Sequence, residues 1–233
     1  MKPLALWSHE LRRAGPAALL AAPILATLTS LFAVFSTELG TRDGVTEWFL
    51  LGAVEMGIPL VAGMAAASLL GQDRALELQL TFPRRYRGTV LRRLTVAFGA
   101  VAGSSLICSA VLLAAGWRNL SPDYPASLTG QLTWLAPTLW LAALGLFAAA
   151  VLRSTAGATT VVAFVWGLQQ LTTAILQENH VTRLLYLFDT TRGTVPEDWL
   201  WNRFTLLATA LPLLAVAWYL LGDTEWVKGG GSE

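Results

Sequence analysis

The sequence contains few of the side chains on which catalysis and metal binding depend. Of its 233 residues only 13% are charged, and it has two histidines, His9 and His180, and one cysteine, Cys108. The two histidines are expected on opposite sides of a membrane, and the chain has no HExxH, GxSxG or Asp-rich phosphate-transfer motif. We therefore expect neither a catalytic site nor a metal site. A single cysteine also excludes an intramolecular disulfide.

The chain also lacks the means to use ATP by itself. It has no GxxxxGK[ST] phosphate-binding loop, and its only lysines are Lys2 and Lys228. The apolar segments contain almost no ionisable residue apart from Glu55, which argues against a carrier driven by protons or sodium. A net charge of +1 gives no indication of nucleic-acid binding. Energy for any transport would have to come from a partner.

What the chain does have is apolar sequence. It is 55% hydrophobic, with a mean hydropathy of +0.55. Its apolar segments each come near the ~20 residues that a helix needs to cross a hydrocarbon core of ~30 Å. We predict an all-α, polytopic membrane protein with one transmembrane permease domain over residues 1–228 and a flexible, linker-like tail at 229–233. The six predicted spans cover about 16–36, 48–71, 94–116, 132–152, 155–176 and 204–221.

The positive charges predict the orientation of these spans. Eleven of the sixteen Lys and Arg residues fall on one side if the spans alternate in direction. Because Lys and Arg accumulate on the cytoplasmic side, both termini are expected in the cytoplasm of a prokaryotic cell, with the protein in its plasma membrane. Residues 3–15 are expected to form an amphipathic helix at the inner surface, or else a charged flank that only orients the first span.

The segment 72–93 between the second and third spans carries six arginines. Asp73 is a favourable N-cap, Leu76 and Leu80 lie four residues apart, and Pro83 is expected to end the short helix that they form. Such a helix on the inner surface either anchors to anionic lipid or docks on a cytosolic partner.

The loop before the last span, residues 178–203, mixes apolar and charged residues and is too short to be a domain. We expect one or two short helices at the outer surface, interfacial or re-entrant. Phe188, Trp199 and Trp201 are predicted to close the outer side of a pathway, and the alternative is a passive belt of interfacial aromatic residues.

Glu55 is expected about 10 Å below the outer boundary, given a rise of 1.5 Å per residue. Gln169 and Gln170 in the fifth span lie at a similar depth. Since a carboxylate exposed to lipid is costly, we predict that Glu55 and one of the glutamines form a polar layer on the substrate path. The alternative is a Glu55 that is protonated and satisfied locally within one subunit.

Small residues and prolines recur within the spans. Gly99 and Gly103 form a GxxxG pattern in the third span, and Gly63 and Ala67 repeat that spacing in the second, which permits close helix approach. A proline inside a span releases a backbone carbonyl and permits a kink. Prolines of this kind are Pro23, Pro59, Pro137 and Pro212.

This order of segments resembles, over nearly the full length, the permease subunits of the ABC type-2 transporter family. Their coupling region reads as an acidic residue and Arg, then Glu-Leu-Leu, Pro and basic residues. In this sequence Ala75-Leu76 stands where the family has Gly-Thr, and Gln72-Asp73 stands for the leading Glu. The residues that match the coupling region, or that the resemblance places in it, are Asp73, Arg74, Leu76, Glu77, Leu80, Pro83, Arg84 and Arg85.

The resemblance implies two permease subunits, as a homodimer or heterodimer, paired with two cytosolic ATPases that bind ATP and Mg²⁺. It also implies export of a drug, antibiotic, peptide or lipid. The alternative function is a membrane scaffold or sensor without transport activity, whose basic loop binds anionic lipid or a signalling partner.

Overall fold

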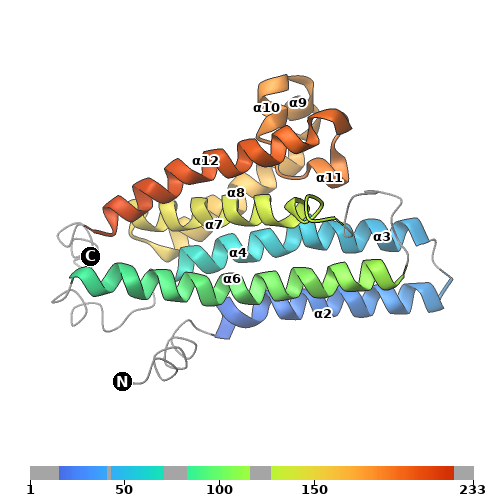
Figure 1. Ribbon diagram of the computed structural model, residues 1–233, viewed down its shortest axis with the longest axis horizontal. Coiled ribbons are helices and arrows are strands. Elements are labelled where there is room, and N and C mark those ends of the chain that lie inside the picture. Colours follow the sequence, from blue (N-terminus) through green and yellow to red (C-terminus); the bar gives the residue numbers. More distant parts are fainter. Residues whose placement is uncertain (1–15, 41–42, 71–82, 116–126, 223–233) are drawn as a thin grey trace.

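The computed structural model describes residues 16–40, 43–70, 83–115 and 127–222. Every element in these ranges is helical, as the sequence predicts. The helices form an elongated bundle, with several short helices gathered at one end (Figure 1). The elements are α2 (Pro16–Glu38), α3 (Asp43–Gly52), the π-helical turn η1 (Ala53–Gly57), α4 (Ile58–Ser68), α6 (Pro83–Ala114), α7 (Leu132–Leu152), α8 (Thr155–Leu171), α9 (Thr173–Glu178), α10 (His180–Leu184), α11 (Asp189–Arg192), the 3-10 turn η2 (Pro196–Asp198) and α12 (Trp199–Leu220).

Five helical stretches in the described part of the chain are long and apolar enough to cross a membrane, which makes a multi-pass membrane protein plausible. They account for five of the six predicted spans. The remaining prediction, 155–176, is divided between α8 and α9. The five stretches are Leu19–Ser36, Gly44–Ser68, Gly88–Ala114, Leu132–Leu152 and Pro196–Leu220.

The helix breaks at Thr172, whose φ of −103° and ψ of 19° lie outside the helical region. Threonine hydroxyls around the break bond to the preceding turn, the Thr172 Oγ1 to the Leu168 carbonyl at 2.7 Å and the Thr173 Oγ1 to the Gln170 carbonyl at 3.0 Å. Side chains that bond to backbone carbonyls in this way often bend helices. The 17 residues of α8 are therefore followed by a change of direction rather than by more span.

The bundle has two unlike ends (Figure 1). The end that we name the basic end contains the start of α2, the ends of α4 and α12, and the tight connection between α7 and α8 at Arg153 and Ser154. Arg153 takes a left-handed conformation with φ of 54° after the last turn of α7, and the Ser154 hydroxyl caps α8 by accepting from the Gly157 amide. The opposite end contains residues 173–198, which we name the cap.

The centre of the bundle is the crossing of α4 and α7, and α12 packs on the other side of α7. A Cβ atom built on Gly145 of α7 would lie 2.2 Å from the carbonyl oxygen of Gly63 on α4 and 3.2 Å from the backbone nitrogen of Ala67. The small-residue spacing of Gly63 and Ala67 is thus confirmed as a site of close helix approach. Gly99 and Gly103 differ, because in the described part of the chain no atom of another helix lies within 4 Å of the Cβ position of either.

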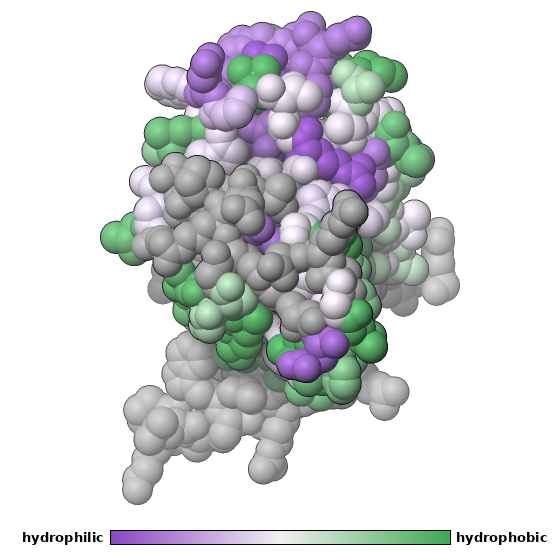
Figure 2. All heavy atoms as spheres, turned by 90° about the vertical axis from the view of Figure 1, so that its right-hand side faces the viewer, coloured by the Kyte–Doolittle hydropathy of each residue, from purple (hydrophilic) through white to green (hydrophobic). Residues whose placement is uncertain are grey.

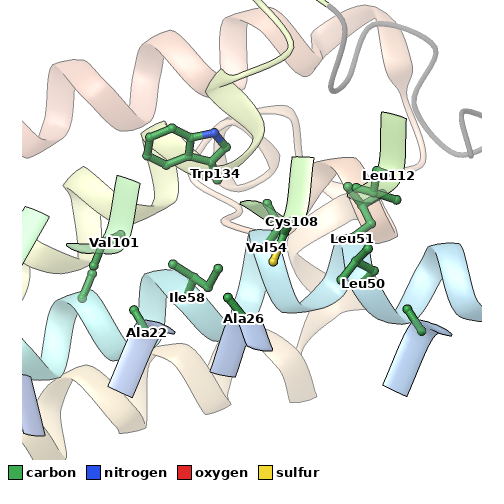
Figure 3. Close-up of a cluster of buried hydrophobic side chains, with 12 residues drawn as sticks. Ala22, Ala26, Leu50, Leu51, Val54, Ile58, Val101, Cys108, Leu112 and Trp134 are labelled. Atoms are coloured by element: carbon green, nitrogen blue, oxygen red, sulfur yellow. The ribbon is translucent and has the colours of Figure 1, made fainter. Parts of the chain in front are cut away.

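A second core joins α2, α3, η1, α4 and α6. Ala22 and Ala26 of α2 lie against the face of α4 that carries Ile58 (Figure 3). Cys108 of α6 is a buried free thiol in this cluster, close to Val54 of η1 (Figure 3). It is the small buried apolar residue that its apolar surroundings predict.

The second span changes helical register at η1. The Ile58 amide bonds to the carbonyl of Ala53, five residues earlier, instead of the carbonyl four residues earlier. Pro59 favours this register, because in an α-helix its ring would crowd the carbonyl of Glu55 and it has no N–H to donate to it. The kink that Pro59 permits is therefore realised as a π turn, which places Glu55 at its centre.

Candidate functional site: the cap and its buried ion pair

Figure 2 shows the molecule from the side that lies at the right of Figure 1, the cap end of the bundle. Hydrophilic residues gather over the upper part of this view, where the cap lies, and apolar residues appear at the flanks and lower down among the coloured atoms. The short helices α10 and α11 fall within residues 178–203 and confirm the short helices predicted there, whereas α9 occupies the end of the predicted fifth span. The cap covers buried polar side chains, and its own Tyr186, Leu187 and Phe188 belong to an apolar cluster with residues of the bundle.

The connection between α10 and α11 has an irregular backbone, and side chains of α8 and α12 bond to its amides and carbonyls. The Gln169 carboxamide of α8 accepts a hydrogen bond from the Leu187 amide at 2.8 Å and donates one to the Leu185 carbonyl at 3.4 Å. The Asn202 side chain of α12 donates to the carbonyls of Arg183 and Tyr186, at 2.9 and 2.7 Å. Irregular backbone near membrane depth requires such partners, because lipid supplies none.

Glu55 binds the first turn of α11. One carboxylate oxygen accepts from the Thr190 amide, and the other accepts from the Thr191 amide, both at 2.8 Å. The Thr191 hydroxyl donates to that second oxygen at 2.6 Å. The side chain of Glu55 is completely buried, so these donors replace the water that a carboxylate loses on burial.

Arg203, near the start of α12, neutralises Glu55. Its Nη2 forms a salt bridge with Glu55 Oε1, and both side chains are 0% exposed. The same guanidinium donates to the Leu187 carbonyl at 3.0 Å and to the Thr190 hydroxyl at 2.7 Å. A buried ion pair with additional hydrogen bonds on both members is the arrangement in which attraction can offset desolvation. The pair joins the second span, the cap and the last span.

Aromatic side chains enclose this ion pair. Trp199 lies with its ring 5.5 Å from the Arg203 guanidinium carbon and donates from Nε1 to the Thr190 hydroxyl at 2.9 Å. Phe188 is fully buried and makes edge contacts with Tyr186 and Trp166. Of the three predicted gate residues, Phe188 is therefore buried in the cap, and Trp199 is a partly buried residue at the start of α12 that bonds to the cap.

Trp201 differs, because its side chain is 67% exposed on the outside of α12. Exposure of a tryptophan near the end of a membrane helix is typical of an interfacial aromatic residue. Closure of a pathway by Phe188, Trp199 and Trp201 stays a prediction.

A second carboxylate lies next to the first. Asp189 is buried at the start of α11, where the Gln177 carboxamide donates to it at 3.4 Å. Burial raises the pKa of the Asp189 carboxyl above its ordinary value, and the Arg203 guanidinium opposes that rise. Gly193 covers this carboxylate so closely that a Cβ there would lie 2.4 Å from Oδ1. Only glycine fits at that position without displacing Asp189.

Of the predicted polar layer, Glu55 and Gln169 both bind the segment 185–191, and Gln170 donates to the sulfur of Met56 at 3.1 Å. Glu55 is thus satisfied within one chain, by Arg203 and two amides, but through an ion pair rather than as the protonated group of the local alternative. A role for Glu55, Gln169 and Gln170 on a substrate path stays a prediction.

The predicted coupling residues fall mostly outside the described residues: Asp73, Arg74, Leu76, Glu77 and Leu80 all do. Pro83, Arg84 and Arg85 form the first turn of α6. Pro83 therefore begins the long helix of the third span, which starts eleven residues earlier than the predicted 94. Proline is favourable at a first helical position because its missing N–H would have no partner there.

A signal for Arg203 was present in the sequence. Glu55 is nearly alone as an ionisable residue within the spans, and a buried carboxylate requires a partner. Arg203 stands near the start of α12, where it pairs with Glu55. The part played by Thr190, Thr191 and Asn202 had no such signal, because it depends on how the cap folds back.

Within the described ranges, no group of three His, Cys, Asp or Glu side chains is placed to hold a metal ion. Comparisons of the chain with protein-family models, with curated protein sequences and with solved structures gave no match.

Proposed function

We propose that this chain is the membrane-spanning permease subunit of an ABC exporter, which pairs with a second permease subunit and is driven by a separate cytosolic ATPase. The observation that carries the proposal is the division of labour between the two ends of the bundle. One end carries a cap of short helices bound to a carboxylate of the second span. The other is where that span leads into the basic segment 72–93.

The difference between the two ends of the bundle suits a transporter better than a scaffold that only anchors to lipid. A scaffold needs only the basic segment to bind lipid, and it has no use for a cap that closes the far end of a helical bundle. A permease needs both a site where a cytosolic motor docks and a barrier at the opposite face. Helices α2 and α12 also present large apolar side chains outwards, which suits contact with lipid or with a second permease subunit.

The first test is purification of the chain from its own membranes in mild detergent, with mass spectrometry of what accompanies it. We expect a cytosolic ATPase with a GxxxxGK[ST] loop, whose hydrolysis rate rises when it is bound to the chain. The variant Leu76→Asp with Glu77→Lys, in the predicted coupling helix, should abolish that stimulation and leave membrane insertion unchanged.

Leu128→Asp is the matched control, because Leu128 is 93% exposed and precedes α7 at the cap end. It should leave ATP hydrolysis unchanged. Unchanged stimulation in the Leu76 and Glu77 variant would contradict the coupling assignment. Binding to anionic vesicles without any accompanying ATPase would favour the scaffold or sensor instead.

A further inference from the structure

Two adjacent residues of the π turn receive contacts from three later helices. Glu55 binds the amides of α11 and the guanidinium of Arg203 on α12. Met56 accepts from α8 through its carbonyl, to which Trp166 Nε1 donates at 3.0 Å, and through its sulfur, to which Gln170 donates. These bonds connect residues 110 to 148 positions apart along the chain. The turn η1 is therefore the place where the second span meets the cap.

The direction of both side chains depends on the helical register of η1. A π turn contains one more residue than the α-helical turn it replaces, and successive residues of an α-helix lie 100° apart around the axis. If residues 53–57 became α-helical, Glu55 would turn about the axis relative to α4 and away from α11 and Arg203. Pro59 disfavours this, because its ring would crowd an α-helical Glu55 carbonyl, whereas Pro23, Pro137 and Pro212 are accommodated inside α-helices.

Helix α4 continues without interruption from η1 to the basic end. Near its middle it crosses α7 at the contact between Gly63 and Gly145, where the two backbones touch. A helix supported at a close backbone contact moves as a rigid element, since packed cores resist continuous deformation. A displacement of α4 at the basic end would therefore also displace η1.

We propose that the π turn is the joint through which α4 holds the cap closed, with Pro59 setting its register and Glu55 making its contact. This inference rests on the proposed function in one respect, because the proposed ATPase would supply the movement of α4. The cap would then open when η1 withdraws the Glu55 carboxylate from the Thr190 and Thr191 amides. Those two amides are the direct reporters of the joint.

The experiment measures hydrogen exchange by mass spectrometry on the full chain in lipid nanodiscs, without ATPase, in a peptide covering residues 187–195. Two single variants are compared: Pro59→Ala, which permits an α-helical register, and Glu55→Asp, which keeps the charge but shortens the reach. We expect each to speed exchange of this peptide by roughly tenfold, the factor that corresponds to about 1.4 kcal/mol. The double variant should be no faster than the faster single variant.

A further pair of variants tests transmission along α4. Gly145→Ala pushes α4 away from α7 and should also speed exchange of the peptide, but it should add nothing in the Glu55→Asp background. The matched controls are Pro23→Ala in α2 and Gly103→Ala on an open face of α6, and both should leave the cap at the wild-type rate.

The proposal would be overturned if the 187–195 peptide exchanged at the wild-type rate in Pro59→Ala. It would also be overturned if the double variant exchanged faster than either single variant, by the product of their two effects. If Pro59→Ala does not fold, Glu55→Asp decides the matter, because wild-type exchange in that variant overturns the proposal as well. If the hydrogen-exchange experiment fails, the proposed pairing with an ATPase is unaffected. If the exchange results support the joint but no ATPase accompanies the purified chain, only the proposed function is contradicted.

Discussion

Gly145 of α7 touches the backbone of Gly63 on α4, and a Cβ on Gly145 would lie 2.2 Å from the Gly63 carbonyl oxygen. The Gly63 carbonyl is part of the helix backbone, so it cannot rotate away from an added Cβ as a flexible side chain would. We expect Gly145→Ala to destabilise the protein by about 1–3 kcal/mol, the usual cost of overpacking a core. Thermal unfolding in detergent measures it. Gly103→Ala is the control, because with open space around it alanine should instead stabilise helix α6, by up to about 1 kcal/mol.

The ion pair between Glu55 and Arg203 should show strong coupling in a double-mutant cycle. Removing one member leaves a buried charge without its partner, so Glu55→Gln and Arg203→Gln are each expected to cost about 3–5 kcal/mol of unfolding free energy. The double variant should cost clearly less than the two together, with a coupling of about 0.5–3 kcal/mol. Additive losses in a denaturant titration would show that the two side chains do not act as a pair.

The role of Glu55 in transport is a separate question from its role in stability. Glu55→Gln keeps the shape and can still accept from the Thr190 amide, whereas Glu55→Leu removes both charge and acceptors. We expect transport to fall moderately in the first variant and severely in the second, at equal expression. Normal export by Glu55→Leu would remove Glu55 from any functional account of the cap.

Asp189 should make the cap sensitive to pH. Because burial raises the pKa of its carboxyl in the folded state, the folded cap binds this proton more tightly than the unfolded chain. The resulting stability is complete below the ordinary carboxyl pKa and is lost as the pH rises through the raised value. The charged groups that act on Asp189 are Arg203 on α12, Glu55 on η1 and Arg183 on α10.

Hydrogen exchange of the cap, corrected for the intrinsic effect of pH on exchange, should therefore show greater protection on the acidic side of that transition. Asp189→Asn cannot ionise and should abolish the dependence while keeping the bond to Gln177. A dependence that persists in Asp189→Asn would have to come from another group.

Asn202 fixes the turn before α11 through the carbonyls of Arg183 and Tyr186. Asn202→Leu keeps the approximate volume but leaves both carbonyls without this donor. We expect a loss of about 1–3 kcal/mol for each buried acceptor that stays unsatisfied. The neighbouring exposed Trp201 offers a control, since Trp201→Ala should change the unfolding temperature little. Equal effects of the two variants would contradict the assignment.

Much of the fold could be predicted from the sequence because each span carries its own signal. A run of about 20 apolar residues requires a membrane helix whatever its neighbours are, since its backbone must be satisfied internally. The helices of the cap and the close approach at Gly63 could be predicted on similar local grounds. Pro59 is one of four prolines at which the sequence permits a kink. Pro23, Pro137 and Pro212 lie inside continuous α-helices, so the sequence does not distinguish the proline at which the register changes.

Contacts between distant segments could not be predicted in this way. A buried Glu55 needs a partner because of its charge. The identity of that partner, Arg203, 148 positions away, depends on how the last span packs. The break at Thr172 and the open face at Gly99 and Gly103 depend likewise on neighbours that local patterns do not specify. The sequence by itself predicted a bundle of membrane-length helices and a costly carboxylate, Glu55, inside the second of them. Only the tertiary structure decided what neutralises that carboxylate, because burial and pairing are properties of packed surfaces rather than of single helices.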